Sequence, residues 1–247
     1  MSNLTFLTQE QCFESEKLDI LQKRGIKAAI TDFAILLGGW IGRKHIDGDE
    51  SLEGRTGCYW TKSDGGDNGG VRTVFTNGEC DYKDVLKRYV GARPALLFSS
   101  ISSLPMNGVS GATKRARDGV LEVEYGYYPQ KAVSRDMQEK LERAFERRSL
   151  SRTGKKYTTD SRKLEDDYST FSPKQYDEFQ LDGKKYVRVE ANSCFGVFGF
   201  KLSNGESYKD GNPVWVEVSP VKWLVDEKAK IMLTDKLIFA GVQFNHI

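Results

Sequence analysis

The segment "YVGARPALLFSSI", Tyr89 to Ile101, places an Arg-Pro pair directly before a run of apolar residues in the middle of the chain. Proline has no backbone N–H and restricts the preceding residue to extended conformations, so Arg93-Pro94 suits the start or the edge of a β-strand. We expect the Arg93 guanidinium to bind a carboxylate or loop carbonyl groups as structural support. The segment is typical of the end of a domain, although the chain continues to residue 247.

The composition is that of a folded protein. Hydrophobic residues make up 38% and aromatic residues 11% of the 247 residues, which is enough to form the core that a disordered chain lacks. The 37 basic and 35 acidic residues leave a formal net charge of +2. This balance argues against both a dedicated nucleic-acid binder and an acidic nucleic-acid mimic.

The N-terminal residues "MSNLTFLTQEQCFESEK" lack a basic region followed by an apolar stretch, and the sequence contains no run of 18 apolar residues. We therefore predict a soluble, cytoplasmic protein without a membrane partner. Cys12, Cys58, Cys80 and Cys194 show no metal-binding spacing, and only two histidines accompany them, so we predict no metal and no other cofactor. We expect reduced thiols, with a Cys58–Cys80 disulfide between neighbouring strands as an open alternative.

The first hundred residues predict two helices followed by a small antiparallel sheet. Thr8 and Gln11 match a capping box and Gly25 offers a stop, so we predict a helix over residues 9–24. "KAAITDFAILLGG" (27–39) is apolar on most sides and predicts a second, buried helix. The β-prone runs that follow are separated by Gly, Asp and Asn, and they are "GCYWTKS" (57–63), "GVRTVFTNG" (70–78) and "GARPALLFSSI" (91–101).

The second half predicts strands around one amphipathic helix. Residues 102–119 are rich in Ser, Gly and basic residues and indicate a linker or long loop. "VLEVEYGYYPQ" (120–130) predicts a strand, and apolar residues spaced four apart predict a helix over about 132–150, at positions Val133, Met137, Leu141 and Phe145. Asp182-Gly183 predicts a hairpin turn, and residues 214–239 predict at least two more strands. This order, without βαβ alternation, indicates an α+β fold.

A family resemblance rests on these same segments. "TDFAILLGG", "GCYWTKS", "VRTVFTNG" and "VGARPAL", in that order, resemble the closing half of an uncharacterised domain family of Gram-positive bacterial and prophage proteins. That family is related to the C-type-lectin-like and formylglycine-generating-enzyme-like folds. "VEYGYYPQKAV", "DGKKYVRV" and residues 214–239 resemble the way in which its domains begin, so the halves stand in inverted order here.

The resemblance implies two lobes. Residues 1–101 would form a C-type-lectin-like antiparallel sheet with flanking helices, 102–119 a linker or long loop, and 120–247 a second, smaller β-rich lobe with one amphipathic helix. Some proteins of the family carry a reactive cysteine pair, whereas Cys58 and Cys80 do not reproduce that motif. The resemblance therefore implies a fold and gives no support to an oxidase activity.

Our first functional hypothesis is a non-catalytic recognition module of bacterial or prophage origin. Loops 43–54, 64–70 and 79–88 would display variable side chains on a rigid sheet and bind a protein or glycan. Tyr59 and Trp60 are neighbours on a predicted strand, so we expect one ring in the core, with Trp60 as its anchor, and the other facing outward. The candidate ligand-binding residues are Asp64, Asp67, Asn68, Tyr82 and Lys83.

The alternative hypothesis is a phage-encoded inhibitor of a bacterial defence nuclease, which would act by protein–protein binding. Eight basic residues stand against four acidic ones between residues 135 and 156, and such a surface suits a nuclease complex or a nucleic-acid backbone. A solvated helix with Arg135–Glu139 and Glu139–Arg143 pairs is the competing interpretation. The candidate basic surface comprises Arg143, Arg147, Arg148, Lys155 and Lys156.

Neither hypothesis requires catalysis. The sequence contains no recognisable nucleophile motif and no phosphate-binding loop with a lysine, and two histidines leave little for general-base chemistry. We therefore predict that the chain is not an enzyme. We also expect unpaired strand edges near "VWVEVSPVKWLV" (214–225), where self-association or a partner strand would cover them.

Overall fold

The computed structural model describes residues 4–14, 18–42, 55–65, 70–85, 87, 89–100, 114–147, 154–156, 175–191 and 200–241. These residues form a strand-rich α+β fold with mainly antiparallel sheets, as the sequence predicts at this level. No helix among them is long and apolar enough to cross a membrane.

Nine of the described strands form the main sheet, in the order β1-β7-β16-β15-β12-β11-β10, with β9 paired to β15 and β8 paired to β9. All of these pairings are antiparallel. The strands are β1 (Leu4–Thr5), β7 (Ala95–Leu97), β8 (Lys114–Arg115), β9 (Leu121–Ala132), β10 (Gly154–Lys156), β11 (Gln175–Leu181), β12 (Lys184–Glu190), β15 (Pro213–Asp226) and β16 (Ile231–Thr234).

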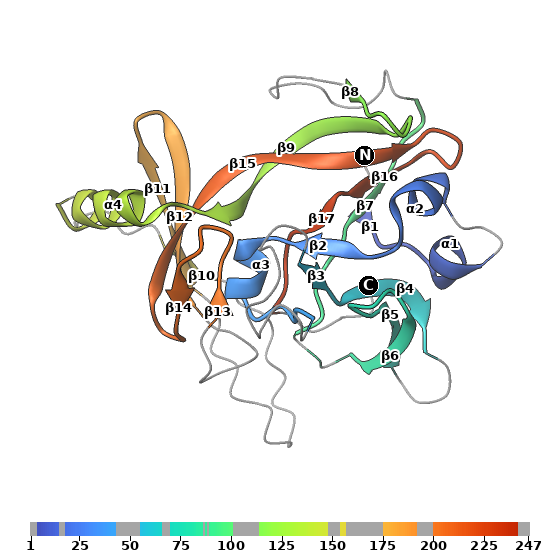
Figure 1. Cartoon of the computed structure of the whole chain (residues 1–247), viewed down its shortest axis with the longest axis horizontal. Coiled ribbons are helices and arrows are strands. Elements are labelled where there is room, and N and C mark those ends of the chain that lie inside the picture. The colour runs from blue at the N-terminus through green and yellow to red at the C-terminus, as the bar shows by residue number, and fades with distance from the viewer. Residues whose placement is uncertain are drawn as a thin grey trace.

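The long strands β9 and β15 form a ribbon that spans the molecule (Figure 1). β9 lines one edge of β15, while β12 pairs with residues 213–217 and β16 with residues 223–226 of its other edge. The expectation of an unpaired strand edge near residues 214–225 is therefore wrong for β15, because this strand has paired neighbours on both of its edges. Self-association of the chain stays a prediction.

The N-terminal helices differ from the prediction in length. The capping box at Thr8 and Gln11 is confirmed, but the predicted helix 9–24 consists of α1 (Gln9–Phe13) and α2 (Asp19–Arg24). Gly25 follows α2 with a φ of 78°, which glycine adopts without strain. The buried carboxylate of Asp226 accepts from the Ile20 N–H at the start of α2, at 3.4 Å, and so replaces a local cap.

The second predicted helix, over residues 27–39, is wrong in its first part. Ala28–Ile30 form β2, which pairs with β3 (Thr56–Gly57) and, in parallel, with β17 (Lys236–Leu237). Thr31 then caps the short helix α3 (Asp32–Leu36). The apolar composition predicted burial correctly, but pairing with two distant strands decided the backbone conformation.

The amphipathic helix predicted over about 132–150 is α4 (Arg135–Arg147), which begins later than predicted because Ala132 still belongs to β9; residues 148–150 lie outside the described residues. The apolar face of α4, with Leu141 fully buried, packs against Tyr186 and Trp215 of the main sheet. Asp182 and Gly183, with φ values of 51° and 77°, turn the β11–β12 hairpin, and a turn with two positive φ values matches the twist of paired strands. β13 (Phe200–Lys201) and β14 (Ser207–Tyr208) pair with each other in a separate two-stranded sheet.

A separate small sheet contains β4 (Tyr59–Asp64), β5 (Gly70–Val74) and β6 (Cys80–Asp84). The predicted loop 79–88 therefore begins as a strand. Trp60 is buried, as expected of a core anchor, but Tyr59 is buried too, so the expectation that one ring faces outward is wrong. The reason is that both faces of β4 are covered: Tyr59 packs in the largest core cluster and Trp60 in a second cluster with Val71 and Val90.

The main sheet and the largest core cluster both contain residues from before and after the segment 102–119, which the sequence suggests as a boundary. β7 pairs with β16, and Phe33 belongs to the same cluster as Val216 and Leu224. Buried Arg93 adds a polar connection: its Nε donates to the Thr234 carbonyl oxygen at 3.0 Å, and its Nη1 donates to the Ile26 carbonyl oxygen at 3.2 Å. The expected role of Arg93 as a support for loop carbonyls is confirmed.

Replacing Arg93 tests this role. Arg93→Ala should lower the free energy of unfolding by about 1–3 kcal/mol, because buried carbonyl groups lose their donor. Arg93→Lys should recover little of this loss, since an ammonium group lacks the planar fork that reaches two carbonyls. Urea denaturation measures both variants, with exposed Arg143→Ala as a control that should stay within about 0.5 kcal/mol of the wild type. Equal stability of Arg93→Ala and wild type would contradict the assignment.

Candidate functional site

The base of the β4–β5 hairpin is locked by an aromatic ring. A Cβ atom added at Gly65 or at Gly70 would overlap the ring of Tyr82, so this ring lies directly on the two glycines. The Gly65 N–H also donates to the Gly70 carbonyl oxygen at 2.8 Å. Asp64 and Asp84 are exposed at the same end of the sheet, where Asp84 pairs with Gly70.

The predicted ligand-binding residues do not gather on one face. Tyr82 and Lys83 are neighbours on β6, so their side chains point to opposite faces of the small sheet. Lys83 forms an ion pair with Asp81 at 2.7 Å and lies 5.5 Å from the centre of the Phe75 ring. Burial acts to lower the pKa of Lys83, but the hydrogen bond and charge of Asp81 outweigh it and leave the pKa raised. Asp67, Asn68 and loop 43–54 lie outside the described residues.

The cysteines of the small sheet are not paired. Cys58 is buried and Cys80 exposed, and both are free thiols, so the alternative of a Cys58–Cys80 disulfide is wrong. Cys80 pairs with Val74, which pairs with Tyr59, so Cys80 lies on the face opposite to Cys58. Burial raises the pKa of Cys58 to about 12, which makes its thiolate inaccessible at neutral pH. Cys194 lies outside the described residues.

The candidate basic surface on α4 is only partly described. Arg143 and Arg147 are exposed, whereas Arg148 and the side chains of Lys155 and Lys156 lie outside the described residues. Of the two predicted helix pairs, Arg135–Glu139 is present at 3.7 Å, while no Glu139–Arg143 pair is seen between these described residues. Exposed acidic side chains therefore interrupt the basic ones along α4.

The inner face of α4 carries a polar contact that the sequence did not indicate. Glu142 accepts hydrogen bonds from Arg188 at 2.8 Å and from the Trp215 indole at 2.7 Å. Partial burial opposes ionisation of Glu142, but these hydrogen bonds and the Arg188 charge leave its pKa lowered. Gln138 bonds both the backbone N–H and the carbonyl oxygen of Trp215 with its side-chain amide, at 2.7 and 2.9 Å. These contacts fix α4 on the sheet.

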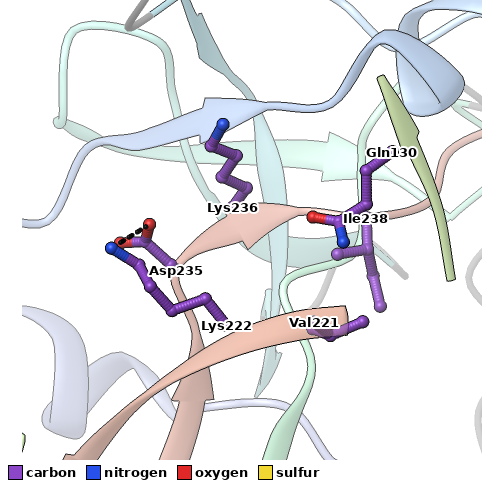
Figure 2. A pocket seen from close by; sticks show the side chains of 6 residues that line it. All are labelled: Gln130, Val221, Lys222, Asp235, Lys236 and Ile238. Carbon is purple, nitrogen blue, oxygen red and sulfur yellow. Dashed lines mark ion pairs between the residues drawn. The ribbon is translucent and has the colours of Figure 1, made fainter. Parts of the chain in front are cut away.

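The pocket in Figure 2 has a volume of about 250 Å³ and lies between the β9–β15 ribbon and the segment from β16 to β17. Lys222 forms ion pairs with Asp235 at 3.1 Å and with Glu122 at 3.5 Å. The pocket is lined by Gln130, Val221, Lys222, Asp235, Lys236 and Ile238. Sequence reasoning missed these residues; the only signal was the presence of Lys222 and Lys236 within otherwise apolar strand segments.

Among the described residues, no group of three or more His, Cys, Asp or Glu side chains could hold a metal ion. No protein-family model, curated protein or solved structure was found to match the chain.

The contact of Tyr82 with Gly70 predicts that the effect of Gly70→Ala on stability depends on whether the Tyr82 ring is present. Gly70→Ala should lower the free energy of unfolding by about 1–3 kcal/mol, because the new methyl group displaces the Tyr82 ring. In a Tyr82→Ala background the same change should be neutral or stabilise by about 0.4–1 kcal/mol, because alanine restricts the unfolded chain. A double-mutant cycle in urea measures the coupling. Additive effects would show that the ring does not pack on Gly70.

Glu142 gives a prediction about pH. Its pKa is lowered in the folded state, so its contribution to stability is present above the usual carboxyl pKa of 4.5 and is lost as the pH falls through the folded value. Glu142→Gln should therefore be less stable than wild type at about pH 7, with a difference that shrinks towards about pH 3. Thermal unfolding across this range measures the difference. Glu139→Gln, an exposed change on the same helix, should stay within about 0.5 kcal/mol at pH 7.

Proposed function

We propose that the chain is a non-catalytic recognition module that binds a protein or glycan ligand at the hairpin end of the small sheet. The observation that carries this proposal is the packing of Tyr82 on Gly65 and Gly70, because it gives the hairpin a rigid base. Exposed Asp64 and Asp84 flank this base and supply hydrogen-bond acceptors. Binding side chains on such a support lose little conformational entropy when a ligand docks.

The construction of the small sheet supports a scaffold role. Its strands have their own apolar cluster around Trp60, and the backbone attaches it to the following segment: the Trp60 N–H donates to Gly91 at 3.1 Å and the Gly91 N–H donates to Cys58 at 2.7 Å. Loops carried on rigid elements are where binding residues concentrate in proteins. A C-type-lectin-like organisation of residues 1–101 is part of the proposal, supported by the short helices α1 and α2 beside antiparallel strands.

The structural contacts made by the buried ionisable side chains support the non-catalytic part of the proposal. Asp32 and Arg55 bind one another at 3.1 Å, and Arg93 binds carbonyl oxygens, so these groups serve structural contacts. The sequence resemblance adds a bacterial or prophage origin to the proposal, and the cytoplasmic setting predicted from the sequence is part of it. The alternative, inhibition of a defence nuclease through α4, would use the exposed side chains of Arg143 and Arg147.

A charge-reversal experiment tests the recognition surface. Asp64→Lys combined with Asp84→Lys should leave the melting temperature within a few degrees, because exposed positions contribute less than about 0.5 kcal/mol each. The same variant should reduce partner capture from a bacterial lysate at least about tenfold, or 1.4 kcal/mol. Quantitative pull-down with and without nuclease treatment measures the capture and shows whether nucleic acid mediates it.

The matched control is Arg143→Glu combined with Arg147→Glu, which changes the charge of α4 by the same amount with opposite sign. This variant should capture partners as the wild type does. If it loses a nuclease complex while the Asp64 and Asp84 variant retains it, the recognition surface is wrong and the alternative function is favoured. Glycan or envelope partners lost only with Asp64 and Asp84 support the proposal.

A further inference from the structure

An irregularity in the central ribbon forms one wall of the pocket. Glu217 pairs with Lys131 and Val218 with Pro129, so Gln130 has no residue opposite it in the ladder. Such a bulge redirects a side chain that regular pairing would hold in line. The Gln130 side chain turns back across β15, and its amide nitrogen donates to the carbonyl oxygens of Ser219 at 3.1 Å and Pro220 at 2.7 Å.

These contacts decide what Gln130 offers to a ligand. The amide nitrogen carries two hydrogens and already faces three acceptors, since the Ser219 hydroxyl also lies 2.9 Å away. The amide oxygen has no donor among the described residues and points into the space between Gln130 and the Lys222–Asp235 pair (Figure 2). The pocket therefore contains an acceptor that a hydrogen-bond donor of a ligand would satisfy.

The charge of the pocket favours an anion. Lys222 is engaged by Glu122 and Asp235, whereas Lys236 is exposed and forms no ion pair within the described part of the chain. The carboxylates of Asp235 and Glu122 offset the charge of Lys222, so Lys236 supplies the lining charge that no ion pair offsets within the described residues. An ammonium group at the rim of a partly enclosed pocket binds a carboxylate through a charge-assisted hydrogen bond.

The size of the pocket restricts the ligand. A volume of about 250 Å³ is below the range of about 300–1,000 Å³ that is typical of drug-sized sites. Buried Val221 and half-buried Ile238 give the pocket an apolar wall that suits a short carbon chain. A ligand of this size has room for one carboxylate, one donor group and a few carbon atoms.

We propose that this pocket binds a small carboxylate that carries a hydroxyl or amino group beside the carboxyl carbon. The carboxylate pairs with Lys236, the hydroxyl or amino group donates to the amide oxygen of Gln130, and the carbon chain lies against Val221 and Ile238. This site is separate from the recognition surface of the small sheet and does not depend on the proposed function.

Titration of the full-length chain with lactate, propionate and alanine, followed by amide chemical shifts, tests the proposal. The three probes share a three-carbon skeleton, and propionate lacks the donor. Lactate or alanine should shift the amides of residues 130, 221–222 and 235–238 and should bind about three- to tenfold more tightly than propionate, the effect of one hydrogen bond. The tighter of the two identifies a hydroxy acid or an amino acid as the ligand class.

Two substitutions make the test specific. Lys236→Met should weaken binding of the preferred probe by about tenfold, while Lys228→Met, an exposed lysine in the turn before β16, should leave it unchanged. Amide spectra of both variants show that they remain folded. The proposal is overturned if no probe shifts the pocket amides at millimolar concentration, if propionate binds as well as lactate and alanine, or if both lysine variants weaken binding equally.

Discussion

The buried carboxylate of Asp32 is the contact on which the arrangement of the other elements depends. It accepts from Arg55 at 3.1 Å, from the Ala132 N–H at 2.9 Å, and from both the N–H and the hydroxyl group of Ser203. The partners come from the residue before β3, the end of β9 and the segment after β13. Burial lowers the pKa of Arg55 and the Asp32 charge opposes this shift, and removing either partner would leave an uncompensated charge in the core.

The ribbon of β9 and β15 connects the Asp32 contacts, which include Ala132 at the end of β9, to the rest of the main sheet. One end of β15 packs beneath α4 and the other end pairs with β16, so the ribbon belongs to both parts of the main sheet. Pro129 and Pro220 lie in its middle, where neither can donate a ladder hydrogen bond. The bulge at Gln130 adjoins them. The same irregularity that interrupts regular pairing therefore leaves an acceptor facing the pocket.

Much of the local structure could be predicted from the sequence because its causes are local. The Thr8 capping box, the Asp182-Gly183 turn, the stop at Gly25 and the apolar face of α4 depend on residues within a few positions of one another. Burial of Trp60 and the role of Arg93 also followed from residue type and neighbours. The candidate site was less predictable, since strand alternation separates Tyr82 from Lys83 and two of the proposed residues lie outside the described part.

By itself, the sequence determined an α+β chain with an amphipathic helix, a hairpin and an apolar segment at residues 27–39, because composition and periodicity record burial. The tertiary structure alone decided that residues 28–30 form a strand, since their partners at 56–57 and 236–237 are distant in the chain. It also decided that Tyr59 is buried, that β15 is central, and that Gln130 meets Lys222 and Lys236 around one pocket. Such long-range pairings depend on the energy of the whole core, which no local pattern of residues contains.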